Sequence, residues 1–163
     1  MAILKEQEPV RDLYPKRPAT ELFDLPFHEA VAAEDTINNF ESWSADCYNA
    51  IMNYSAAEEL DDMKVAALRI GRAAWEAAES EISIGQFLCA IADNWMDGIK
   101  DGRQAFGWMH ILWTDTVQCQ YLAKTLRHFI ESETAITTEN RMKHLAALFA
   151  NANILWRRCD DLC

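Results

Sequence analysis

All four prolines of this 163-residue chain, at positions 9, 15, 18 and 26, lie at one end, and residues 27–163 contain none. Proline fixes its own backbone torsion, lacks an N–H donor and is excluded from helix interiors. The later residues show neither strand-like alternation nor an Asn-Gly or Asp-Gly hairpin between β-branched runs. We therefore expect an all-α protein, with an extended N-terminal arm over residues 1–26 and a single helical-bundle domain over residues 27–163. The bundle should contain four to five mostly antiparallel helices.

Apolar residues at intervals of three and four predict where the first helices lie. The first is expected to run from residue 27 to about residue 54. Ser55 and Glu58 then have the spacing of a capping box, in which each side chain hydrogen-bonds to the other residue's backbone N–H. Ser83 and Gln86 have the same spacing. These two pairs predict the starts of the second and third helices.

The last two predicted helices are the most apolar. The fourth, over about residues 103–132, is apolar around most of its circumference, so we expect it to lie at the centre of the bundle. Thr137 or Thr138 is expected to cap the last helix, where apolar residues recur in steps of three and four. Its wide apolar face either packs on neighbouring helices or contacts a second subunit. For a homo-oligomer, the candidate interface residues are Leu148, Leu155, Trp156 and Leu162.

The acidic charge is concentrated in one part of the chain. The net charge is −11, and residues 27–99 contain 3 basic and 14 acidic side chains, whereas the flanking segments are close to neutral. This composition disfavours direct binding to nucleic acid, which requires lysine and arginine to neutralise phosphates. An acidic face instead suits a protein partner with a basic surface. The candidate binding residues are Glu58, Glu59, Asp61, Asp62, Glu76 and Glu79.

Common catalytic and targeting motifs are absent. The chain has no P-loop, dinucleotide-binding glycine pattern, nucleophile elbow or His-Glu-x-x-His, and no Glu-x-x-His pair of the kind that helical di-iron sites use. The five cysteines form no Cys-x-x-Cys pair, which indicates reduced thiols in a cytoplasmic protein. No apolar run reaches the length of about 18 residues that a membrane span needs. His110 and Asp115 lie in the apolar fourth helix, and the sequence leaves their burial open.

The order of the carboxylates suggests an enzymatic alternative. Glu58-Glu-Leu-Asp-Asp62 begins the second predicted helix, and Asp93 follows on the third. This order resembles that of the all-α NTP pyrophosphohydrolases (the MazG-like family), whose pattern is Glu-Glu-x-x-Glu followed on the next helix by Glu-x-x-Asp. Here aspartate replaces the last acid of the first motif, and Ala90 stands at the glutamate position of the second. The resemblance implies magnesium-dependent nucleotide hydrolysis, with candidate ligands Glu59, Asp62, Glu76, Glu79, Asp93 and Asp97.

Two functions are therefore expected from the sequence. The first is a non-enzymatic cytoplasmic bundle that binds another protein through its acidic face, as a regulator, inhibitor or assembly component, and that uses no cofactor. The second is the magnesium-dependent hydrolase. The two differ in whether the acidic side chains spread over a surface or converge on one cation.

Overall fold

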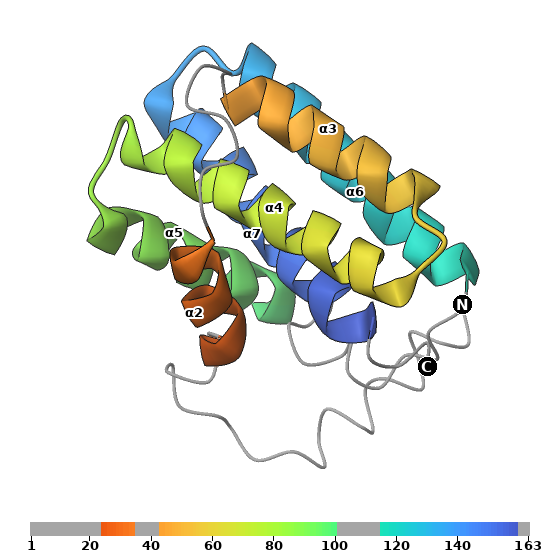
Figure 1. Cartoon of the computed structure of the whole chain (residues 1–163). Coiled ribbons are helices and arrows are strands. Elements are labelled where there is room, and N and C mark those ends of the chain that lie inside the picture. The colour runs from red at the N-terminus through yellow and green to blue at the C-terminus, as the bar shows by residue number, and fades with distance from the viewer. Residues whose placement is uncertain (1–23, 35–42, 101–114, 160–163) are drawn as a thin grey trace.

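A computed structural model describes residues 24–34, 43–100 and 115–159 (Figure 1). Within these ranges the chain forms six helices and no strand, which confirms the predicted all-α fold but exceeds the predicted number of helices. Of the predicted arm, only residues 24–26 are described, and Leu25 and Pro26 already belong to a helix. No described helix is both long and apolar enough to cross a membrane. The helices are α2 (Leu25–Ala33), α3 (Trp43–Ala56), α4 (Leu60–Glu79), α5 (Ile84–Lys100), α6 (Asp115–Thr134) and α7 (Thr138–Arg158).

Four of these helices form a bundle in which each one contacts two others. Helix α3 packs against α4 and α6, and α7 packs against the same two helices from the opposite side. Short turns join α3 to α4 and α6 to α7, so both pairs are antiparallel neighbours, as predicted. Helix α5 lies on the outer side of α7, and the short helix α2 contacts α4 and α7 (Figure 1).

The central helix is α7, and not the helix that was predicted over about residues 103–132. Helix α7 contacts α2, α4, α5 and α6, and most of its residues are buried. The described part of the predicted central helix is α6, which buries only Thr125, Phe129 and Ser132. The more apolar first part of that predicted helix, residues 103–114, lies outside the described residues. The heptad spacing in α7 therefore corresponds to a helix that is covered from several sides.

Two of the predicted helix starts are confirmed by hydrogen bonds. The Gln86 N–H donates to Ser83 Oγ at 3.2 Å, and the Ser83 N–H donates to Gln86 Oε1 at 2.9 Å, which completes a capping box. Thr137 Oγ1 accepts from the Asn140 N–H at 3.1 Å and caps α7. These side chains satisfy backbone donors that the first turns of α5 and α7 would otherwise leave without a partner.

Two other predicted boundaries are wrong. Ser55 lies in the last turn of α3 and does not cap α4, which begins at Leu60. The single helix predicted over residues 27–54 contains two helices, since α2 ends at Ala33 and the backbone of its C-cap residue Glu34 is extended (φ −70°, ψ 128°). Helical spacing alone does not reveal this break because α2 and α3 both place apolar residues at helical intervals.

Helix α2 is anchored by one aromatic side chain. Phe27 is completely buried, with its ring centroid 5.1 Å from that of Phe149 and 5.4 Å from that of Trp156, both on α7. On α4, Gly71 faces the same ring, and a Cβ atom added there would lie 2.7 Å from Phe27 Cζ. The absence of a side chain at Gly71 therefore allows α2 to approach α4 this closely.

Polar contacts hold both ends of α2. Before its first turn, Asp24 Oδ2 accepts hydrogen bonds from Asn153 Nδ2 and Arg157 Nε, each at 2.9 Å, and Oδ1 pairs with Arg157 Nη2. Near its last turn, Arg72 Nη1 donates to the Val31 carbonyl at 3.3 Å. These contacts connect α2 to α7 and α4, so the segment next to the predicted arm is part of the folded domain.

Candidate functional site

A shallow hollow of about 330 Å³ lies between the end of α3 and the start of α4. Its apolar lining includes Val65, whose residue surface is 42% exposed. Arg69 lines it too, with Nε 3.6 Å from Glu34 Oε1. The full lining is Asn53, Ala56, Ala57, Asp62, Val65, Ala66 and Arg69.

Four of the predicted acidic binding residues lie at the start of α4, and one of them, Asp62, lines this hollow. Glu58 and Glu59 are in the turn that precedes α4, and Asp61 and Asp62 are in its first helical turn, where the helix dipole favours negative charge. All four are exposed, and their carboxylates form no ion pair with another described residue. We call the hollow together with these four carboxylates the acidic corner.

The other two predicted binding residues lie at the far end of α4. Glu76 is 14 positions after Asp62, which corresponds to about 21 Å along a helix. Its Oε1 accepts a hydrogen bond from Arg72 Nε at 3.0 Å, and Glu79 is exposed near the helix end. The six predicted residues therefore do not form one face, and the group at the start of α4 includes the one, Asp62, that lines this hollow.

The carboxylates predicted as magnesium ligands do not converge, so this site is corrected. Glu59 and Asp62 lie at the start of α4, whereas Glu76 and Glu79 lie near its end, about 21–30 Å away at 1.5 Å per residue. Asp93 and Asp97, on α5, line a different hollow. The described residues contain one group of three or more His, Cys, Asp or Glu side chains placed to share an ion, and none of these six belongs to it.

The predicted oligomer interface is also corrected. Leu148 and Leu155 are completely buried within the chain, so they belong to the core and offer no surface to a second subunit. Trp156 is partly buried, and its ring packs against Phe27. Leu162 lies outside the described residues. Self-association stays a prediction, but the apolar face of α7 no longer supports it.

The two residues whose burial the sequence left open provide no site. His110 lies outside the described residues. Asp115 is exposed in the first turn of α6, where the helix dipole stabilises a negative charge. Asp115 is therefore not a buried acid of the kind that marks many active sites.

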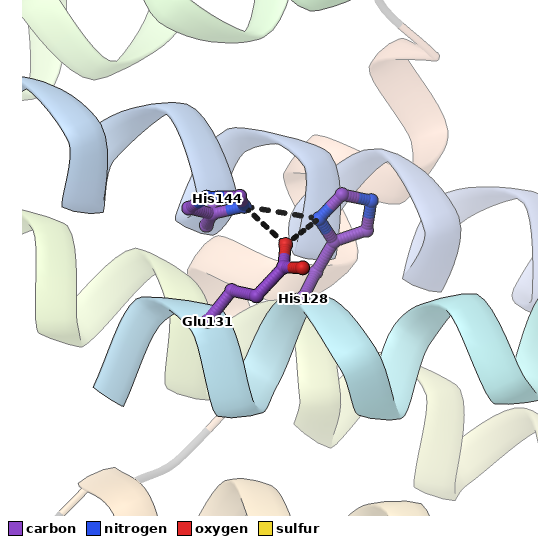
Figure 2. A group of neighbouring side chains, drawn as sticks. All are labelled: His128, Glu131 and His144. Atoms are coloured by element: carbon purple, nitrogen blue, oxygen red, sulfur yellow. Dashed lines mark hydrogen bonds and ion pairs between the residues drawn. The ribbon is translucent and has the colours of Figure 1, made fainter. Parts of the chain in front are cut away.

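The structure brings together three side chains that the sequence analysis missed (Figure 2). His128 and Glu131 lie one turn apart on α6, and His144 lies opposite them on α7. His128 Nδ1 is 3.2 Å from His144 Nδ1, and Glu131 Oε2 is 3.0 Å from His144 Nδ1 and 3.7 Å from His128 Nδ1. The two histidine side chains are each 21% exposed and that of Glu131 is 42% exposed. We call this group the histidine–glutamate cluster.

Buried neighbours fix the helix segments that present the cluster. Phe129 and Ser132 on α6 are buried, as is Leu145 on α7. These residues are adjacent in sequence to His128, Glu131 and His144, so core packing sets the rotation of both helices. Helical di-iron sites use Glu-x-x-His, whereas α6 has the reverse order, His-x-x-Glu.

The electrostatic environment of His128 favours its neutral form. Burial is the largest cause that lowers the pKa of His128 from its ordinary value, and the neighbouring His144 lowers it further. Glu131 acts in the opposite direction, and the nearby cations Arg127 and Lys124 add to the lowering. His128 is therefore a neutral imidazole near pH 7, able to accept a proton or an ion through one ring nitrogen.

Comparisons with known proteins do not identify either site. No protein family, no curated protein and no solved structure matches the chain.

Proposed function

We propose that the protein is a helical binding module that docks a basic, amphipathic segment of a partner protein at the acidic corner. The supporting observation is that Asp62 and Val65 line one hollow, and that Glu58, Glu59 and Asp61 add exposed carboxylates, without ion pairs to other described residues, at the same end of α4. The cation Arg69 also lines the hollow, but it faces the carboxylate of Glu34 at 3.6 Å. A partner segment that presents lysine or arginine beside an apolar side chain matches both features. Complementary charge increases the association rate and the selectivity of such contacts.

The apolar part of the hollow supports a peptide partner over a simple counterion. Val65 is exposed beside the small residues Ala56 and Ala66, which leave room for an inserted side chain. Covering Val65 would remove apolar surface from water, which is favourable by about 25 cal/mol per Å². Salt would weaken the charged contacts and leave this apolar contribution largely unchanged.

The test uses a synthetic amphipathic helical peptide with lysine on one face and leucine on the opposite face. A peptide with glutamate in place of each lysine is the negative control. Neutralising the corner should weaken binding by about 1–3 kcal/mol, since each exposed ion pair contributes about 0.2–1 kcal/mol. Affinity is measured by calorimetry at low and moderate salt. The corner variant combines Glu58→Gln, Glu59→Gln, Asp61→Asn and Asp62→Asn. The control variant removes four exposed charges elsewhere, with Glu79→Gln, Asp93→Asn, Asp97→Asn and Glu133→Gln.

The two variants distinguish a site from a general charge effect. If the corner is the docking site, the corner variant loses affinity and salt dependence, and the control variant stays within about threefold of the unmodified chain. Equal losses in both variants would show that net charge alone attracts the peptide, and would reject the acidic corner as a site.

A further inference from the structure

The ligand atoms of the histidine–glutamate cluster are spaced as the coordination of one metal ion requires. Their separations are 3.0, 3.2 and 3.7 Å. Three atoms with these separations have an equidistant point about 1.9 Å from each, so an ion with bonds of about 2.0–2.1 Å would lie about 0.7 Å out of their plane. A tetrahedral ion with bonds of this length also lies about 0.7 Å from the plane through any three of its ligand atoms. The three side chains therefore need no large movement to bind.

Hydrogen bonding alone satisfies the cluster only in part. Each imidazole Nδ1 has one in-plane direction, which holds either a proton or a lone pair. If one histidine donates its Nδ1 proton to the other, the acceptor has no proton left for Glu131 Oε2. If both rings carry Nδ1 protons toward the carboxylate, two N–H donors lie with their nitrogens only 3.2 Å apart and no acceptor between them. A cation between the three atoms would coordinate all of them at once.

The donor set selects the class of ion. Two imidazole nitrogens and one carboxylate oxygen suit zinc and neighbouring divalent transition metals, whereas magnesium and calcium prefer oxygen ligands. We propose that His128, Glu131 and His144 form a binding site for a Zn²⁺-class transition-metal ion that links α6 to α7. This site is separate from the acidic corner and does not depend on the proposed docking function.

The cluster is open to solvent on one side. Glu131 and His144 line a hollow of about 320 Å³, together with residues of the turn between α6 and α7 such as Ile136 and Thr137. Three protein ligands leave the fourth position of a tetrahedral ion for water or an external ligand. The ion can therefore enter and leave without unfolding of the helical hairpin.

The test is a titration of the full chain with Zn²⁺, and separately with Co²⁺, in the presence of a non-thiol reductant. We expect one Zn²⁺ per chain in calorimetry, and visible d–d absorption of tetrahedral Co²⁺ without a thiolate charge-transfer band. Glu131→Gln and His144→Gln should each weaken Zn²⁺ binding at least tenfold. Their neighbours Glu133→Gln and Lys143→Gln serve as matched controls, because both residues are exposed and lie outside the cluster. Circular dichroism checks that every variant keeps its helices.

Each outcome decides for or against the site. Loss of binding in the two cluster variants with retention in the two controls supports it, as does failure of excess Mg²⁺ to displace Zn²⁺. Three results overturn it: no Zn²⁺ binding at micromolar concentration, equal affinity in all four variants, or a thiolate band that assigns the ion to cysteine. A variant that loses helicity is replaced by His128→Asn, which removes the third ligand, and its Zn²⁺ affinity is judged by the same criterion.

Discussion

Replacing Gly71 by alanine tests the close contact between α2 and α4. The added Cβ would lie 2.7 Å from Phe27 Cζ and 3.3 Å from Val31 Cγ2, well inside ordinary van der Waals distance for the first contact. The Phe27 ring has little freedom to move away, because it is completely buried and contacts Phe149 and Trp156. The substitution therefore forces a shift of α2 itself.

Two opposing effects set the size of the change in unfolding free energy. Alanine is more favourable than glycine in a helix interior by about 1 kcal/mol. Adding a methyl group to a tightly packed contact is unfavourable by about 1–3 kcal/mol, and a 2.7 Å approach to a buried ring belongs in the upper part of that range. We therefore expect Gly71→Ala to destabilise the protein by about 1–2 kcal/mol.

Gly85→Ala is the matched control. Gly85 lies in the first turn of α5, and a Cβ atom there would have no neighbour within 4 Å. This substitution should stabilise the protein by up to about 1 kcal/mol, because only the helix preference changes. Urea unfolding, followed by circular dichroism and tryptophan fluorescence, measures both variants.

A double-mutant cycle identifies the cause. Replacing Phe27 by leucine shortens the side chain that faces Gly71, so Gly71→Ala should be less destabilising in that background. A Gly71→Ala protein that is more stable than the unmodified chain would refute the reasoning. So would a destabilisation that is the same with phenylalanine and leucine at position 27.

Two further predictions concern buried groups. Cys47 and Cys159 are buried, and burial raises the pKa of the Cys47 thiol, whereas Cys89 and Cys119 are exposed. After brief alkylation of the native protein, peptide mass spectrometry should therefore find Cys47 and Cys159 unmodified and Cys89 and Cys119 modified. Rapid labelling of Cys47 would contradict the packing around it. Burial lowers the pKa of His28, so the unfolded chain binds a proton that the folded chain does not, and unfolding free energy should decrease as the pH falls below about 6.5. His28→Leu should make that decrease smaller in urea unfolding near pH 7.5 and 5.5, and an unchanged decrease would show that other groups cause it.

The capping predictions show how far local sequence determines helix ends. Ser83 and Ser55 have the same capping-box spacing, but only Ser83 forms the reciprocal hydrogen bonds. Ser55 follows Tyr54, a buried residue that continues the apolar stripe of α3, so the packing of α3 keeps Ser55 helical. A capping box marks a helix start only where the preceding residues leave the helical conformation. Tertiary packing decides that point, and local spacing does not reveal it.

The wide apolar face of α7 was predicted from the spacing of its apolar residues, but the helices that cover it were not. Leu148 and Leu155 were predicted on that face, and both are completely buried. Spacing alone does not distinguish a face covered by the same chain from one covered by a second subunit. Here α2, α4, α5 and α6 together cover α7, and the contribution of α2 was hidden because its residues were assigned to a longer helix.

The histidine–glutamate cluster follows from the geometry of the helical hairpin that contains it. His128 and His144 are each eight positions from Ile136, the middle residue of the turn that joins α6 to α7. In an antiparallel hairpin, residues at equal distances from the turn lie opposite each other, and Glu131 joins them because it lies three positions along the same face as His128. The predicted Thr137 cap already located this turn, so pairing positions across it would have placed the two histidines together. The remaining information, the rotation of each helix, depends on the burial of Phe129 and Leu145. The positions on either side of the turn therefore determine this cluster, and no motif within one helix contains it.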